Sequence, residues 1–316
     1  MGPEGITKPE GGAARVDVLC AGYACWDLIF EVGHHPGPDE KCFASALFSS
    51  GGGPAANAAV TVARLGGAAA FAGYLGDDFF GGLHLDELRA EGVIPFVLRG
   101  SSPTPLSVIL VKPGGARTVI SHKAETPVVP PGSLDFTELE PAVILLDGHE
   151  PALSTFLARH AREKRIPVVL DAGSVHAGTA GLAPVADYLL ASEKFARDFT
   201  GEPAPAAAAE KLAQIAPFVA VTLGAKGLVW RAGAEAGSLP AVPVDAVDTT
   251  GAGDIFHGAF ALEIARGASP LAALDLAGAA AALGCAKIGA RRGIPTREEL
   301  DRFLAGRRGG ILSTRF

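Results

Sequence analysis

The segment DTTGAGDIFHGAF, residues 248–260, places two glycines and an acid at the start of an apolar stretch. N–H groups at the start of a helix lack partners and carry the positive end of the helix dipole, so a glycine-rich turn entering a helix can bind an anion. Asp254 beside this turn has two possible roles. It could cap the helix, or it could be a general base that deprotonates a hydroxyl while Ala252 and Gly253 N–H groups hold a transferring phosphoryl group.

Two common nucleotide motifs are absent from the places where they would be expected. A P-loop, GxxxxGK[ST], needs a lysine after its second glycine, and Asp254 stands there instead. The first predicted strand ends in AGYACWD, which lacks the GxGxxG fingerprint of dinucleotide-binding folds. The segment therefore favours neither a P-loop enzyme nor a Rossmann dehydrogenase.

A second glycine cluster, GGGPAANAAV, covers residues 51–60. Three glycines followed by Pro54 are typical of a helix start that needs no ligand. Asn57, however, would lie in the first turn of a helix of alanine and valine, where a buried amide needs partners. An amide beside glycines suits recognition of vicinal hydroxyls, and Asp27, just after the first strand, could accept hydrogen bonds from the same ligand.

The elements that must position these residues follow a strand-then-helix rhythm. Continuous apolar runs predict buried strands at 16–21, 69–72, 142–146, 167–170, 188–191 and 218–222. Helices are predicted at 54–65, 80–91, 151–164, 205–216, 254–266 and 270–287. This alternation predicts an α/β fold with a mostly parallel sheet and helices on both faces.

Two strand pairs lack the intervening helices: 28–32 with 41–48, and 106–111 with 117–122 around the turn KPGGAR. They predict a small separate sheet, a lid or an edge extension, formed by segments of about 28–48 and 95–122. We expect one domain over 1–316, with residues 1–14 as a mobile tail.

Composition narrows the function classes. The 316 residues include 48% hydrophobic residues, enough for a large core, and the net charge of −7 argues against a duplex-binding surface. The four cysteines form no CxxC pair, as expected in a reducing compartment. No signal-peptide pattern and no strongly apolar stretch of membrane length occurs, so a cytoplasmic protein without nucleic-acid or membrane partners is expected.

The segments GGGPAANAAVTVARLG and VDTTGAGDIFHGAFAL together closely resemble the two signature motifs of the ribokinase-like, or PfkB, carbohydrate kinases, and the similarity extends from about residue 16 to about residue 305. The resemblance implies a three-layer α/β/α sandwich with a β lid, use of ATP and Mg²⁺, and phosphorylation of a sugar or nucleoside hydroxyl. It also implies roles for individual residues: Asp254 as the base, Gly251, Ala252 and Gly253 as the anion hole, and Asp27, Gly52, Gly53 and Asn57 as sugar contacts.

Further segments are similar to the family's nucleotide side. VTLGAKG, residues 221–227, looks like the family's turn at the ATP phosphates, with Thr222, Gly224 and Gly227 as contacts, although an ordinary strand–turn–strand would look the same. Arg117 on a lid strand could reach the γ-phosphate or be a solvated surface residue. The resemblance also implies a monovalent-cation loop, and hence an expected potassium dependence, formed by Asp248, Thr250, Gly289 and Gly293.

One segment departs from the family pattern. Where many members carry N-x-x-E to organise Mg²⁺, this chain has SEKF, residues 192–195. Ser192 remains an expected ATP contact, and Glu193 or Asp171 could replace the magnesium-organising acid. Three features resemble the ketohexokinase and sulfofructose kinase branch: the loss of N-x-x-E, Arg117 on the lid strand, and the segment DGHEP at 147–151. His149, however, stands where sulfofructose kinase carries an arginine.

The sequence therefore predicts an ATP-dependent sugar kinase acting on a ketose such as fructose, with His122 as a further substrate contact and homodimerisation through the lid. Two alternatives stay open. One is a ribose or nucleoside kinase; a nucleoside would need an aromatic clamp, for which Phe43 and Phe48 are the candidates. The other is a catalytically silent sugar- or nucleotide-binding regulator, which an intact Asp254 argues against.

Overall fold

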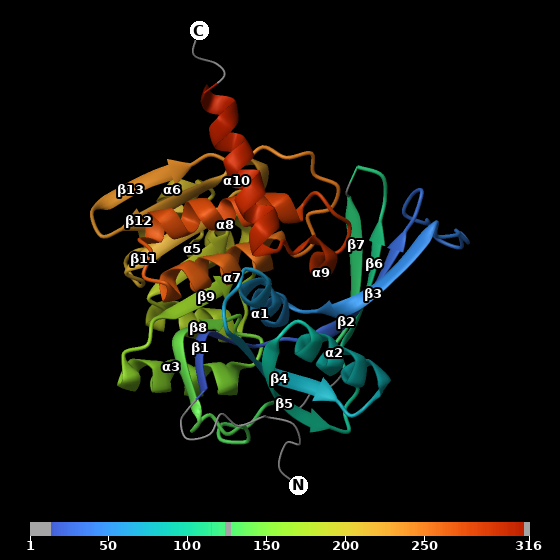
Figure 1. Cartoon of the computed structure of the whole chain (residues 1–316), viewed down its shortest axis with the longest axis horizontal. Helices are drawn as coiled ribbons and strands as arrows, with labels where there is room; N and C mark the ends of the chain where they lie inside the picture. Colours follow the sequence, from blue (N-terminus) through green and yellow to red (C-terminus); the bar gives the residue numbers. More distant parts are fainter. Residues whose placement is uncertain (1–13, 115, 124–127, 313–316) are drawn as a thin grey trace.

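The computed structural model describes residues 14–114, 116–123 and 128–312, with side chains through residue 307. A nine-stranded sheet runs through its middle (Figure 1). The strands are, in spatial order, β13 (Glu235–Leu239), β12 (Leu228–Ala232), β11 (Phe218–Thr222), β10 (Tyr188–Ser192), β9 (Val168–Ala172), β8 (Leu139–Leu146), β1 (Ala14–Ala21), β4 (Ala69–Gly76) and β5 (Val93–Gly100). Neighbours from β11 to β5 are parallel, which confirms the predicted mostly parallel sheet.

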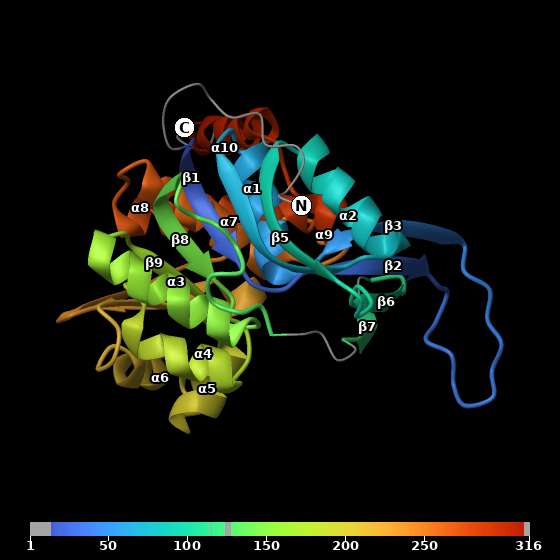
Figure 2. The same ribbon diagram turned by 90° about the horizontal axis from the view of Figure 1, so that it is seen from below.

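Helices cover both faces of this sheet, as Figure 2 shows from below. One hydrophobic cluster packs α1 (Pro54–Arg64), α2 (Phe79–Ala90), α7 (Ala252–Ala265), α8 (Pro270–Gly284) and α10 (Arg297–Leu312) on one face. A second cluster packs α3 (Pro151–Lys164), α4 (Ala177–Leu182), α5 (Glu193–Thr200) and α6 (Pro205–Leu212) on the other. Because both faces are covered, strands such as β4 are buried along their whole length, which explains their unbroken apolar sequence. The predicted three-layer sandwich is confirmed.

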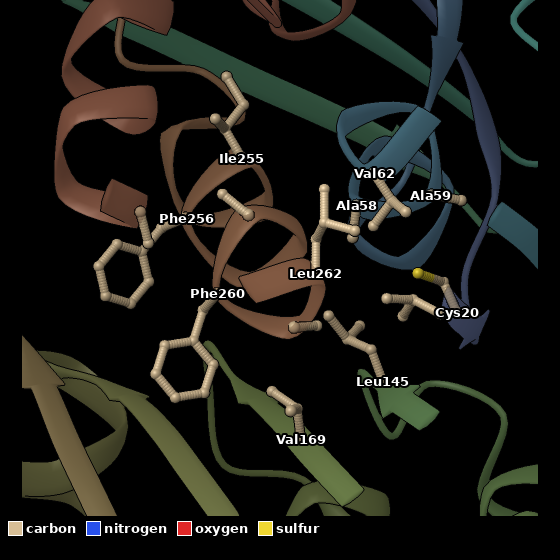
Figure 3. Packing of buried hydrophobic residues seen from close by; sticks show 14 of the residues in the cluster. Cys20, Ala58, Ala59, Val62, Leu145, Val169, Ile255, Phe256, Phe260 and Leu262 are labelled. Carbon is tan, nitrogen blue, oxygen red and sulfur yellow. The ribbon is translucent and has the colours of Figure 1, made fainter. Parts of the chain in front are cut away.

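The crossing of α1 and α7 is the packing feature that matters most for the site. A Cβ at Gly258 would lie 2.6 Å from the carbonyl oxygen of Ala58, so glycine is needed where the two backbones meet. Around this crossing the apolar side chains interdigitate, with Leu262 beside α1 and Phe260 facing the sheet (Figure 3). The crossing fixes the start of α7 against the first turn of α1.

The predicted second sheet is present and stands beside the sandwich (Figures 1 and 2). Its strands lie in the order β3 (Ala46–Gly52), β2 (Cys25–Glu31), β6 (Leu106–Val111) and β7 (Arg117–His122). Its boundaries differ from the prediction, because residues 93–100 form β5 of the large sheet and β2 begins at Cys25. Pro95 and Phe96 continue the parallel ladder beside β4, so a lid segment starting at 95 was wrong.

Some elements differ from those predicted from the sequence. The antiparallel edge strands β12 and β13, and the helices α4, α5, α9 (Ala290–Gly293) and α10, were not predicted. The predicted tail lies outside the described residues except for Ala14, which begins β1. In the described part of the chain, no helix combines the length and apolarity needed to cross a membrane.

Candidate active site

The candidate site lies at the carboxyl edge of the large sheet, where the chain order reverses around β1. From β1 the chain continues to β4 on one side, and β8 later pairs on the other side. Asp147, just after β8, fills this crevice: its carboxylate accepts hydrogen bonds from the Tyr23 N–H at 2.8 Å and the Ala55 N–H at 3.2 Å. This buried carboxyl ties the end of β1 to the start of α1, a role that the sequence analysis missed.

Asp254 lies in the first turn of α7, at the same edge. The N-cap of α7 is Gly251, whose φ of +76° favours glycine, and Ile255 is the first residue whose N–H bonds back to the Gly251 carbonyl, at 2.9 Å. Asp254 is thus the third residue of the helix and does not occupy the N-cap, so the interpretation of Asp254 as the N-cap was wrong. The Gly253 backbone lies in the same turn, before the helical hydrogen-bond ladder begins.

The charge state of Asp254 is set by its surroundings. The pKa of its carboxyl is raised to about 6, mainly by burial and also by the neighbouring carboxylate of Asp171, while a hydrogen bond from Asn57 and the imidazole of His257 oppose this rise. A carboxyl with a pKa near 6 is ionised at neutral pH and still basic enough to take a proton.

Asn57 is the direct partner of Asp254. It is buried in the first turn of α1, and its Nδ2 donates to Asp254 Oδ2 at 2.7 Å. The contact joins the two glycine motifs, because Asn57 and Asp254 are 197 residues apart in the chain. The structure therefore brings these two predicted site residues into direct contact, and their roles stay a prediction.

Asp27 comes from β2 of the small sheet and lies against the first glycine cluster. A Cβ at Gly52 would be 2.1 Å from Asp27 Oδ2, so only glycine lets the carboxylate pack there. Gly53 has a φ of +98° and precedes α1, where a Cβ would lie 2.4 Å from the Tyr23 carbonyl oxygen. Burial raises the pKa of Asp27 to about 6, although the Cys25 thiol donates to its carboxylate at 3.2 Å.

The expected nucleotide contacts lie further along the same edge, on the other side of β9. Ser192 ends β10 and Thr222 ends β11, and the two are partners in the strand register. The Ser192 hydroxyl caps α5 by accepting from the Phe195 N–H at 2.9 Å. Gly224 and Gly227 form the turn between β11 and β12 with φ of +58° and +89°.

Arg117 and His122 occupy opposite ends of β7 in the small sheet. The Arg117 guanidinium donates to the Thr249 hydroxyl, in the turn that leads into α7. The small sheet therefore reaches the start of α7 through Arg117. His122 is exposed, and among the described residues it forms no hydrogen bond to Asp27, Asn57 or Asp254.

The segments expected to form a monovalent-cation loop are joined by Asp248. Its buried carboxylate accepts from the N–H and hydroxyl of Thr250, at 2.9 and 2.6 Å, and from the Gly289 N–H at 2.8 Å. Gly293 ends α9, and its N–H donates to the Gly289 carbonyl at 2.9 Å. These contacts hold the loop before α7 against α9, and a potassium ion there stays a prediction.

No side chains in the described part of the chain gather into a group of three or more His, Cys, Asp or Glu suited to a metal ion. Glu193 is exposed in the first turn of α5, and Asp171 lies 3.1 Å from His257 Nδ1. Magnesium usually keeps several waters and binds through one or two carboxylates plus substrate phosphates. Glu193 and Asp171 are the carboxylates that could assist a magnesium ion held mainly by ATP phosphates, and this assignment stays a prediction.

A pocket of about 670 Å³ opens near Asp147. The His149 N–H donates to Asp147 at 2.9 Å, and its ring stacks on His176 with 4.6 Å between centroids. Burial raises the pKa of the adjacent Glu150 to about 7. The pocket places polar and aromatic groups next to the crevice that Asp147 fills.

Comparison with known proteins agrees with this geometry. The family model described as "pfkB family carbohydrate kinase" matches residues 16–297. Ribokinase of Bacillus subtilis (strain 168) is 29% identical over 294 residues, covering 92% of this chain and 99% of that protein. Fructokinase-1 of Oryza sativa subsp. japonica is 29% identical over 296 residues, covering 83% and 90%.

A solved structure of Arabidopsis thaliana ribokinase complexed with ribose and ATP superimposes with a TM-score of 0.78, at 26% identity, covering 93% of this chain and 99% of that chain. The family model spans most of the chain, including both glycine clusters, Asn57 and Asp254. The chain belongs to the pfkB family of carbohydrate kinases.

Proposed function

We propose that this protein transfers the γ-phosphoryl group of ATP to a hydroxyl of a small sugar, ribose or a ketose such as fructose. The observation that carries the proposal is the 2.7 Å contact between Asn57 and Asp254 at the start of α7. It places a basic carboxylate, an amide donor and a helix N-terminus within one site. Each of these groups has a task in phosphoryl transfer to an alcohol.

In the proposed reaction, the acceptor hydroxyl lies between Asp254 and the N–H groups of the first turn of α7. Asp254 takes the hydroxyl proton as the oxygen forms its bond to the γ-phosphorus, and the bond to the β-phosphate oxygen breaks, releasing ADP. The N–H groups around Gly253 stabilise the charge on the transferring group. Magnesium, bound with ATP, would neutralise phosphate charge.

The small sheet would complete the site. Asp27 would accept hydrogen bonds from sugar hydroxyls beside Asn57, and Arg117 would bind the γ-phosphate. The contact of Arg117 with Thr249, just before α7, supports this role. Closure of this sheet over the sugar would exclude water that otherwise hydrolyses ATP. Ser192, Thr222, Gly224 and Gly227 would contact ATP along the strand ends.

Two relatives support a sugar acceptor, since one is named ribokinase and the other fructokinase. The aromatic candidates for a nucleoside clamp do not favour a nucleoside. Phe43 is 82% exposed, and the Phe48 ring lies under Arg292, with 4.2 Å from the guanidinium carbon to the ring centroid. The relatives named ribokinase support ribose at least as well as a ketose, and similarity to the ketohexokinase branch stays a prediction.

The proposed assembly is a homodimer through the small sheet. Leu47, Val119 and Ile120 expose 57%, 48% and 61% of their surface on its edge strands. Strand edges with exposed apolar side chains favour pairing with another copy. Light scattering tests this directly, with Ile120→Lys expected to give a monomer.

The four cysteines form no disulfide, which supports a cytoplasmic location.

The deciding experiment measures ADP release from ATP and Mg²⁺ with a panel of pentoses, ketoses, aldoses and nucleosides, in potassium and in sodium buffers. Wild type and Asp254→Asn are compared. The substitution keeps the size and polarity of the side chain but removes the base, so kcat should fall roughly 10²–10⁴-fold.

Turnover on ribose or on a ketose, lost in Asp254→Asn, would support the proposal and rank the acceptors. Near-normal kcat in the variant would contradict the role of Asp254. A folded wild-type protein that binds ATP but phosphorylates no acceptor would instead favour the silent regulator. Equal rates in potassium and sodium would remove the predicted cation dependence.

A further inference from the structure

Arg291 is one of the largest fully buried side chains in the described structure, with 2% of its surface exposed. It lies in α9, within the segment GARRGIP. Burying a guanidinium is costly unless its N–H donors have partners. The side chains that Arg291 contacts therefore indicate what this buried charge does. One of its neighbours, Asn57, belongs to the part of the proposed site that would bind the sugar.

The guanidinium contacts three side chains from α1 and α2. Its Nε donates to Asn57 Oδ1 at 3.2 Å, its Nη1 lies 3.7 Å from Glu87 Oε1, and its Nη2 lies 3.5 Å from His84 Nε2. Burial holds the pKa of His84 well below its usual value, so its ring is neutral. The shortest of the three contacts is the one to Asn57.

The contact to Asn57 decides which way its amide faces. An amide side chain has an acceptor oxygen and a donor nitrogen, whereas arginine can only donate. Because Oδ1 must face Arg291, Nδ2 must face Asp254, which is the arrangement found. A turned amide would direct its oxygen at the Asp254 carboxylate and its N–H group at the guanidinium, losing both hydrogen bonds.

We infer that Arg291 is a positioning residue: it locks the Asn57 amide so that its N–H group orients the Asp254 carboxylate toward the acceptor hydroxyl. This inference rests on the proposed function, since it takes Asp254 as the base. Arg291 acts through Asn57, because the structure places the Asn57 side chain between the guanidinium and Asp254.

The other groups around Asp254 make this N–H important. Asp171 from β9 and Asp147 after β8 repel the carboxylate, and His257 on α7 attracts it. Cys25, from β2, also lies within electrostatic reach of Asp254, and burial keeps its thiol protonated. Asn57 is the neutral donor in this set, and its hydrogen bond lowers the pKa of Asp254.

The test compares Arg291→Met, which fills similar space without a donor, with Arg291→Lys, which keeps a donor-only cation. Arg64→Met is the matched control. Arg64 donates to the carbonyls of Arg291 and Ile294, at 2.8 and 2.9 Å, so its loss loosens the same segment without removing the Asn57 contact. Thermal unfolding of every variant confirms that it is folded.

Two readouts separate this inference from the proposed function. The first is the pH profile of kcat with KM for ATP and for the sugar. The second needs no turnover: the Asp254 carboxyl is titrated by NMR in protein labelled at aspartate Cγ, with its signal assigned by Asp254→Asn. Failure of the proposed function would appear as absent turnover or an active Asp254→Asn, whatever the titration shows.

For Arg291→Met we expect kcat to fall roughly 10- to 100-fold with KM for ATP unchanged. The Asp254 titration should move to higher pH, and Arg291→Lys should recover part of that shift. Arg64→Met should lower the unfolding temperature and leave the titration in place. An unmoved titration in Arg291→Met, an equal shift in Arg64→Met, or no recovery by lysine in a folded protein would overturn the inference.

Discussion

The sandwich and the small sheet hold their residues in different ways. Two large hydrophobic clusters pack the sandwich, whereas the buried hydrophobic cluster of the small sheet contains Ile29, Ile109 and Val111. All six residues of β7 are exposed. Asn57 and Asp254 belong to the first region, and Asp27 and Arg117 to the second. The proposed base is thus held in a rigid core, while the residues proposed to contact the sugar and the phosphate lie on an element with little core of its own.

The largest expected effect is on the pH dependence of activity, to which each region contributes one carboxyl. Burial raises the pKa of both Asp27 and Asp254 to about 6. If both must be ionised, kcat/KM should fall below pH 6 with a limiting slope of about 100-fold per pH unit. Asp27→Asn should reduce this slope to about 10-fold per unit, measured by initial rates over the acid range.

The same two carboxyls have a stability effect of defined sign. Their folded-state pKa values lie above the unfolded values near 4, so the native state binds protons more strongly between about pH 4 and 6. Their ionisation therefore costs stability as pH rises through about 6. Asp27→Asn and Asp254→Asn should raise the unfolding temperature at pH 8 and lose that gain near pH 4. A gain that grows on acidification would contradict the pKa assignments.

A smaller effect is expected at the crossing of α1 and α7 in the rigid region. Gly258→Ala should lower the free energy of unfolding by about 1–3 kcal/mol, because its Cβ would meet the Ala58 carbonyl oxygen at 2.6 Å. Gly278→Ala, in α8, meets nothing within 4 Å and should stabilise by about 0.5–1 kcal/mol. Urea titration measures both. Equal effects would mean that the α1–α7 crossing is not the rigid element described.

The smallest effect is a matched pair of single-methyl deletions, one in each region. Ile144→Val, in the large sheet, removes a methyl from a fully buried side chain and should cost about 1 kcal/mol of global stability. Ile109→Val, 3% exposed in the small sheet, should cost less globally and instead speed hydrogen exchange of the β2 and β6 amides. If both variants lower global stability equally, the small sheet unfolds with the sandwich.

Local pattern predicted most of the sandwich. The continuous apolar strands and the Pro-initiated helices α1, α3, α6 and α8 were visible because buried parallel strands and helix starts leave strong signals. β12 and β13 were missed because they are only partly buried, so they have neither a long apolar run nor a clear alternation. The second lid segment was predicted to begin at about residue 95 because β5 resembles the lid strands in sequence. Only the pairing of β5 with β4 shows that it belongs to the large sheet.

Site residues next to glycine motifs could be predicted from the sequence. Charged residues that are buried only through contacts with distant parts of the chain were missed. Asp254 and Asn57 follow glycine clusters whose backbone geometry requires those glycines. Asp147 and Arg291 look like surface residues in the sequence. Their burial follows from partners far along the chain, Tyr23 and Asn57, that no local pattern reveals.

The segment around α9 also sets when the site can form during synthesis. Arg291 and Asn57 are 234 residues apart, and Arg64 reaches the Arg291 carbonyl across 227 residues. Contacts of such long range form late in folding, after the intervening chain has been ordered. A nascent chain that has not yet released α9 from the ribosome can fold α1 against the sheet but cannot lock the Asn57 amide. The polypeptide can therefore complete the proposed reaction centre only after the chain through α9 has been translated.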